Sequence, residues 1–127
     1  MHDTVESGKS RGFVETMFNR RRYLPELQSS NFNTRSFGER VAMNMPIQGS
    51  AADIIKIAMV RVYKELNKHN MKSRLILQVH DELIIETHIS ERAQIEKILQ
   101  ECMQNAVKLD VPLIAEVKTG SSWYETL

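Results

Sequence analysis

The sequence is short of the residues that form covalent or metal cross-links. Its 127 residues include one cysteine, and no group of cysteines and histidines has the spacing of a zinc site. One cysteine has no partner within the chain, so an internal disulfide is excluded. Because Cys102 falls on an apolar helical face, we expect a buried and unreactive thiol. The formal net charge of +1 also argues against a polyanion-binding surface over the whole chain, although local basic patches remain compatible with it.

Long hydrophobic runs are missing as well. No apolar stretch approaches the ~20 residues that a membrane-spanning helix needs, and no signal peptide is recognisable. We therefore expect a soluble protein of a reducing compartment with no membrane partner. Residues 1–12 contain few apolar anchors and end on Gly12, a pattern typical of the tail of a helix. This pattern predicts that the chain is a fragment of a longer one.

The rest of the chain mixes strand and helix patterns. Hydrophobic periodicity predicts hairpins at residues 13–25 and 74–87, helices at 35–45, 48–70 and 89–107, and a closing strand at 113–118. Pro46 predicts an interruption or a bend between the first two helices. Helices and hairpins in this order predict an α+β fold, in which helices cover one face of an antiparallel sheet.

The second hairpin carries three polar residues, His80, Asp81 and Glu82, between two apolar runs. A carboxylate beside buried strands needs solvent, a partner or a metal ion. The three residues therefore indicate either a solvated turn or a site for a divalent cation. The residue pattern by itself leaves both open.

A polar row is expected on the helical stretch, because Arg40, Asn44 and Gln48 follow one another at four-residue spacing. Four residues turn an α-helix by about 400°, so the row is continuous if the helix continues past Pro46. These side chains donate hydrogen bonds, and every base pair offers acceptors in the minor groove of a duplex. The row can therefore hold a duplex without reading its sequence. An exposed polar face is the alternative.

An arginine triplet, Arg20 to Arg22, is expected in the turn of the first hairpin. Three arginines in a turn are compatible with a solvated loop and with phosphate binding, since arginine pairs well with phosphate oxygens. Residues 49–52, with the sequence Gly-Ser-Ala-Ala, leave little side chain on the following helix. We expect a backbone segment or a ligand to approach closely there.

Two stretches resemble signatures of the bacterial family A DNA polymerases. Residues 40–53, RVAMNMPIQGSAAD, resemble one signature, and residues 78–82, QVHDE, resemble motif C of that family. The basic turn in residues 18–25 and the ending at residues 120–124 match as well, so the resemblance covers essentially the whole chain. It implies that residues 1–127 are the C-terminal part of the polymerase domain, comprising the late palm with the base of the fingers. The aspartate of motif A and the fingers helix do not occur in this chain, so the isolated chain is expected to be inactive.

The resemblance also implies a reaction. A DNA-directed DNA polymerase adds deoxynucleotides to a primer 3′-hydroxyl by two-metal phosphoryl transfer, in replication and repair. The implied cofactor is Mg²⁺, with two ions in the intact enzyme, and the implied partners are primer-template DNA and deoxynucleoside triphosphates in the bacterial cytoplasm. Asp81 is implied as a catalytic metal ligand, Glu82 as a supporting catalytic carboxylate, and His80 as a contact of the primer terminus.

For the other polar residues, the resemblance implies that the polar row contacts the DNA minor groove. The arginine triplet would supply phosphate contacts or structural pairs. Two alternatives are a metal-dependent nuclease and a non-catalytic, palm-like nucleic-acid-binding module. The nuclease needs a second carboxylate, for which Asp53 and Glu86 are the candidates. An incomplete sheet would leave an edge and an apolar face exposed, which predicts self-association of the fragment.

Overall fold

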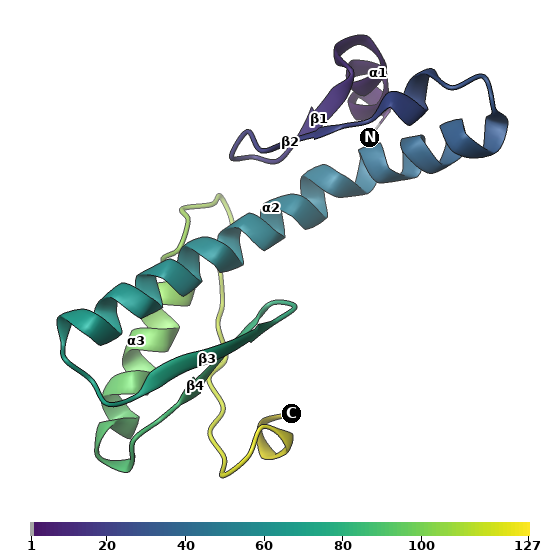
Figure 1. The fold of residues 1–127 in the computed structure, drawn as a ribbon. Helices are drawn as coiled ribbons and strands as arrows, with labels where there is room; N and C mark the ends of the chain where they lie inside the picture. The colour runs from purple at the N-terminus through teal and green to yellow at the C-terminus, as the bar shows by residue number, and fades with distance from the viewer. Residues whose placement is uncertain (1) are drawn as a thin grey trace. The chain divides into compact units, whose positions relative to one another are not determined.

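The computed structural model describes residues 2–127, which divide into two compact units at the boundary between Asp53 and Ile54. The elements follow the order α1, β1, β2, α2, β3, β4 and α3, with short 3-10 turns between some of them (Figure 1). Helix α2, Phe32–Lys68, belongs to both units. Across residues 2–127, none of the helices is long and apolar enough to cross a membrane.

The first unit begins with helix α1, His2–Arg11, as the pattern of the opening residues predicts. Gly12 ends the helix with a φ of 83°, and its N–H donates to the carbonyl of Gly8 at 2.8 Å. A positive φ of this kind at the end of a helix suits glycine, which has no Cβ. Strands β1, Phe13–Glu15, and β2, Arg21–Tyr23, then form the predicted antiparallel hairpin. The buried core of the unit consists of Val5, Val14, Leu24, Leu27, Ala42 and Met45.

The arginine triplet is divided between a turn and a strand. The N–H of Thr16 donates to the carbonyl of Arg20 at 3.0 Å, and Asn19 has a positive φ of 64°. Arg20 therefore lies in the turn, whereas Arg21 and Arg22 lie on β2. The expectation of three arginines within one turn is wrong, because β2 begins at Arg21 and the turn therefore ends two residues before the end of the arginine run.

Helix α2 continues through Pro46, where the sequence predicts an interruption or a bend. Its first turn is capped by Asn31, whose side-chain oxygen accepts a hydrogen bond from the N–H of Thr34 at 3.1 Å. Proline lacks the N–H that would bond to the carbonyl of Ala42. Ala42 and Met45 are buried in the core of the first unit, so packing supports the helix where that bond is missing.

The second unit packs helices on one hairpin. Strands β3, Arg74–Val79, and β4, Glu82–Glu86, are antiparallel, and helix α3 spans Arg92–Gln104. One buried cluster joins α2, β4, α3 and the residues after α3, and its members are Ile55, Ala58, Val62, Leu66, Leu83, Ile95, Ile98, Cys102 and Ala106. The α+β prediction is confirmed, with the strands arranged in two two-stranded sheets within residues 2–127.

Helix α3 begins after a 3-10 turn, Ile89–Glu91. The Glu91 carboxylate accepts hydrogen bonds from the backbone N–H groups of Lys72 and Ser73, and from the Ser73 hydroxyl at 2.8 Å. These bonds stabilise the charged form and lower the pKa of Glu91, the backbone bond from Lys72 contributing most. Cys102 is buried on α3, as predicted, and burial raises the pKa of its thiol.

The closing strand predicted at residues 113–118 is wrong. These residues alternate between half-buried and exposed, as a strand would, but they form no strand. The N–H of Ala115 donates to the side-chain oxygen of Gln104 at 3.2 Å, and its carbonyl accepts from the Gln100 side chain at 3.3 Å. Side chains of α3 therefore take the backbone groups at Ala115 that a neighbouring strand would otherwise pair.

The β3–β4 hairpin has a two-residue turn, because Val79 pairs with Glu82. The register shifts once, between Leu75 and Leu77, which indicates a bulge. His80 is the first turn residue and has a φ of 52°. Both common two-residue hairpin turns require a positive φ at this position, where glycine is usual. The turn therefore carries backbone strain at a histidine.

The core assignment on α2 can be tested with one substitution at two positions. Val62 is fully buried, whereas Val60 on the same helix is 49% exposed. We expect Val62→Ala to lower the free energy of unfolding by about 2 kcal/mol, because it removes two buried methyl groups and leaves a cavity. Val60→Ala should change it by less than about 0.5 kcal/mol. Urea unfolding of both variants measures the difference, and equal midpoints would contradict the assignment.

The strain at the hairpin turn can be tested by comparing two replacements of His80. At an ordinary position alanine is more stable than glycine, but a left-handed conformation reverses the order. We expect His80→Gly to be more stable to urea than His80→Ala by about 1 kcal/mol. The opposite order would show that residue 80 does not hold a positive φ.

Candidate functional site

The polar row is continuous and exposed. Because α2 runs without a break through position 46, Arg40, Asn44 and Gln48 lie one turn apart on a single helix. All three side chains are exposed to solvent. The condition on which the sequence argument depended, a helix that persists past the proline, is therefore met.

The row forms one wall of a groove of about 770 Å³ in the first unit. The arginine triplet also lines this groove, which therefore brings together two polar features that are far apart in the sequence. The lining residues are Arg20, Arg21, Arg22, Phe37, Arg40, Val41, Asn44, Met45, Gln48 and Gly49. Four arginine side chains and two amides around one concave surface suit an anionic ligand with hydrogen-bond acceptors.

The three arginines have different partners. Arg20 forms an ion pair with Asp53, with 2.8 Å between Nε and Oδ1. Arg21 forms an ion pair with Glu15 at 3.2 Å, and its guanidinium lies 4.3 Å from the centre of the Phe13 ring. Arg22 has no acidic partner within residues 2–127. Its guanidinium is exposed, so it is the member of the triplet whose charge is most available to a phosphate.

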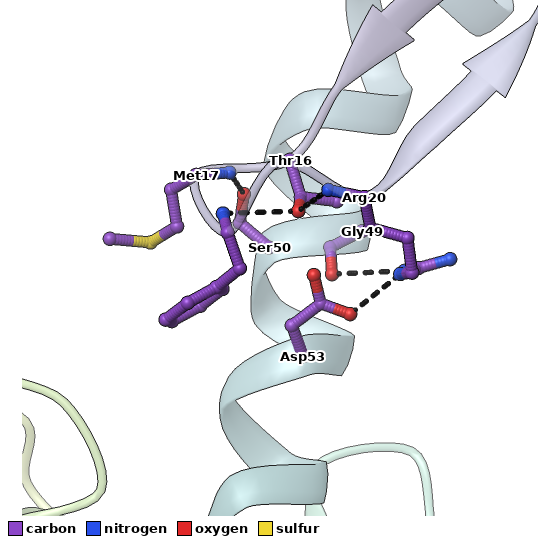
Figure 2. A network of polar contacts seen from close by, with 7 residues as sticks. Thr16, Met17, Arg20, Gly49, Ser50 and Asp53 are labelled. Carbon is purple, nitrogen blue, oxygen red and sulfur yellow. Dashed lines mark hydrogen bonds and ion pairs between the residues drawn. The ribbon is translucent and has the colours of Figure 1, made fainter.

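The turn of the first hairpin is fastened to α2 by several hydrogen bonds (Figure 2). The N–H of Met17 donates to the Ser50 hydroxyl at 2.9 Å, and Arg20 Nη2 donates to the carbonyl of Gly49 at 3.3 Å. A Cβ at Gly49 would lie 2.9 Å from Cγ2 of Thr16. The prediction of a close approach at residues 49–52 is confirmed, and the approaching segment is the turn.

The carboxylate turn, His80 to Glu82, lies at the tip of the β3–β4 hairpin in the second unit. Its three side chains are exposed, and the carboxylates of Asp81 and Glu82 make no hydrogen bond or ion pair within the described residues. The Gln78 side chain donates to the carbonyl of His80 at 2.6 Å and so helps to hold the turn. Two adjacent carboxylates that face solvent supply the oxygen ligands that a hard divalent cation prefers.

The two further carboxylates considered for a nuclease have other surroundings. The Asp53 carboxylate is buried and engaged by Arg20. Glu86 faces Arg74 across the hairpin, at the end of β4 that is farther from the turn. At the rise of a strand, Glu86 is about 13 Å from Glu82. No group of three His, Cys, Asp or Glu side chains in the described part of the chain is arranged to hold a metal ion. Asp53 is thus already paired with an arginine, and Glu86 lies at the wrong end of its strand to share an ion with Asp81.

Sequence reasoning missed the pairing of Asp53 with Arg20. The two residues are 33 positions apart, and neither helical nor strand periodicity relates them. The available signal was the run of small residues before Asp53, which predicted close approach without naming the approaching segment. Only the packing of the turn on α2 shows that the acid and the arginine meet.

Comparison with known proteins gives a consistent assignment. The model of DNA polymerase family A matches residues 1–125. DNA polymerase I of Caldicellulosiruptor bescii is 52% identical over 126 residues, which are 99% of this chain and 15% of that protein. DNA polymerase I of Bacillus subtilis is 54% identical over 125 residues, covering 98% of this chain and 14% of that protein. The chain thus spans about one seventh of the length of these relatives.

A solved structure agrees with these relatives. The POL domain of Pol1 from M. smegmatis, in complex with DNA primer-template and dNTP, superimposes with a TM-score of 0.95 at 47% sequence identity. The match covers 98% of this chain and 22% of that one. Sequence and fold lead to the same conclusion: the chain belongs to DNA polymerase family A.

Proposed function

We propose that this chain is the late palm, with the base of the fingers, of a bacterial DNA-directed DNA polymerase. The intact enzyme adds deoxynucleotides to a primer 3′-hydroxyl in replication and repair. The family assignment and the similarity to bacterial DNA polymerase I support this proposal. Its partners are primer-template DNA and deoxynucleoside triphosphates, both of which accompany the similar POL domain.

The observation that carries the proposal is the solvent-exposed Asp81 at a two-residue turn, next to Glu82. The donor set fits Mg²⁺, which takes one or two protein carboxylates and completes its shell with phosphate oxygens and water. Asp81 would hold the ion, and Glu82 would support it. Bound magnesium supplies charge stabilisation for the attacking and leaving oxygens of phosphoryl transfer. A companion aspartate from elsewhere in the intact protein would complete a two-ion site.

In this proposal, His80 positions the primer terminus and does not transfer a proton. Its backbone is strained in the left-handed region, and Gln78 holds its carbonyl, so the direction of its side chain is set by the turn. The exposed imidazole next to Asp81 suits contact with the primer terminus. Strain at a polar turn residue is a known compromise at functional sites, where stability is lost in exchange for placement.

The groove in the first unit holds the duplex. The polar row donates hydrogen bonds to minor-groove acceptors, which occur in similar places in every base pair. Arg22 binds a phosphate, because it is exposed and has no acidic partner within the described residues. Arg21 contributes less, since Glu15 already offsets part of its charge. These contacts position the duplex without reading its sequence.

Three further properties belong to the same proposal. The isolated chain carries out no templated synthesis, because it contains only one of the two metal-binding aspartates of the family. Its exposed apolar side chains, among them Ile76, Ile114 and Tyr124, favour self-association when the rest of the palm is missing. The intact enzyme works in the bacterial cytoplasm.

The metal role is tested by removing charge at two carboxylates of the same hairpin in the intact polymerase. We expect Asp81→Asn to lower the rate of nucleotide incorporation about a thousandfold, because several kcal/mol of charge stabilisation are lost. DNA affinity should change little. Glu86→Gln, at the far end of β4, is the matched control and should retain the normal rate. Single-turnover incorporation measures both, and near-normal turnover by Asp81→Asn would refute the metal role.

Minor-groove contact is tested with Gln48→Ala in the intact polymerase. Loss of one hydrogen bond should lower extension of a matched primer about fivefold. A terminal mismatch displaces the groove acceptors, so its extension should fall less and discrimination should decrease. Gln94→Ala removes an exposed glutamine from α3 and is the control. Primer extension on matched and mismatched termini gives both ratios, and unchanged ratios for Gln48→Ala would count against groove contact.

A further inference from the structure

We propose that the Asp53–Arg20 pair is a positioning brace for the duplex-binding groove. In this inference, which rests on the proposed function, Asp53 is a positioning residue for the minor-groove contacts of the polar row. Arg20 acts as a strut, by which we mean that its ion pair with Asp53 holds the turn against α2, and it does not bind a phosphate. The brace fixes the end of the Thr16–Arg20 turn, so that Arg20, which lines the groove together with Gln48, keeps a set position relative to the polar row.

The environment of Asp53 argues that its carboxylate is committed to Arg20. Asp53 is 9% exposed, and its Oδ1 accepts from Arg20 Nε at 2.8 Å. The other oxygen, Oδ2, is buried without a hydrogen-bond partner within the described residues. A buried carboxylate with one oxygen unpaired is unfavourable for stability compared with an apolar residue of similar size. A contribution to fold stability therefore explains poorly why an acid occupies position 53. A requirement to hold Arg20 in a fixed position explains it better.

The geometry that the brace controls lies next to the polar row. The turn is fastened to α2 at Gly49, Ser50 and Asp53, and Gly49 directly follows Gln48 in the chain. Figure 2 shows Arg20 directed toward both the Gly49 carbonyl and Asp53. Within the turn, the Thr16 hydroxyl accepts from the N–H of Arg20 at 3.2 Å, so the backbone that carries Arg20 is also held. Releasing the pair would let Arg20 and the strand residues that follow it move relative to Gln48.

The Asp53 carboxylate offsets the positive charge of Arg20, so this guanidinium attracts a phosphate less strongly than an unpaired arginine does. Arg20 already has a carboxylate at hydrogen-bond distance, whereas Arg22 has none within residues 2–127. A phosphate that bound Arg20 would have to compete with Asp53. Each phosphate contact releases counterions and steepens the salt dependence of DNA binding by about 0.9 in a plot of log affinity against log salt concentration. A strut and a phosphate ligand therefore differ in a measurable slope.

The first experiment measures that slope for primer-template binding by the intact polymerase. The variant Arg20→Ala/Asp53→Ala removes the pair without leaving a buried charge unpaired. We expect its slope to equal that of the wild type, whereas Arg22→Ala should reduce the slope by about 0.9. A comparable reduction in the double variant would overturn the assignment of Arg20 as a strut.

The second experiment measures discrimination between matched and mismatched primer termini. We expect Asp53→Ala to lower discrimination about fivefold, as does Gln48→Ala, because a displaced Arg20 weakens one hydrogen bond of the row. Asp53→Asn keeps an oxygen for Arg20 Nε and should restore most of the discrimination. The matched controls are Glu39→Ala and Glu39→Gln. Glu39 lies on α2 and pairs with Lys9 of α1, and loss of this ion pair should have no effect on discrimination.

A double variant separates positioning from general damage. If Asp53 acts through Gln48, then Asp53→Ala/Gln48→Ala should lose no more discrimination than Gln48→Ala alone. Additive losses, or equal losses in the Glu39 variants, would overturn the brace and indicate nonspecific destabilisation. An intact discrimination ratio in Gln48→Ala would instead refute the proposed groove contact itself. A loss in Gln48→Ala with none in Asp53→Ala would refute only the brace.

Discussion

The unbroken course of helix α2 through Pro46 is the constraint on which the candidate interface depends. A helix that stopped at the proline would turn Gln48 out of line with Arg40 and Asn44, because helical phase is lost at a break. The same continuity places Gly49, Ser50 and Asp53 after the row in one helical frame. The helix is held on both sides of the missing N–H. Before the proline, Ala42 and Met45 are buried in the core, and after it, Ser50 and Asp53 bond to the turn of the first hairpin.

Around this helix, like charges are used for different purposes. Arg20 is neutralised by a buried acid, Arg21 is shared between Glu15 and the face of Phe13, and Arg22 remains exposed. A charge that is already paired gives little to an incoming phosphate, whereas an exposed and unpaired one retains its full attraction. Three adjacent residues of one type thus become a strut, a partly compensated cation and a candidate phosphate ligand.

The carboxylate turn shows the opposite arrangement. Asp81 and Glu82 are exposed and unpaired within the described residues, and His80 adopts a backbone conformation that glycine would adopt with less strain. A stable hairpin tip would be built with glycine and fewer adjacent like charges. Under the proposed function, the adjacent carboxylates and the strained His80 are understandable, because a divalent cation and a primer terminus would contact this turn.

Local patterns in the sequence determined a large part of this protein. Hydrophobic periodicity predicted the two hairpins and the buried face of α3, and four-residue spacing placed the polar row on one face of a helix. These features depend only on neighbours along the chain. Tertiary structure alone decided that residues 113–118 form no strand and that the backbone groups of Ala115 bond to the side chains of Gln100 and Gln104. It also decided that Asp53 meets Arg20 and that the arginines and the row line one groove. These outcomes join residues far apart in sequence, and no local spacing encodes which distant segment will supply the partner.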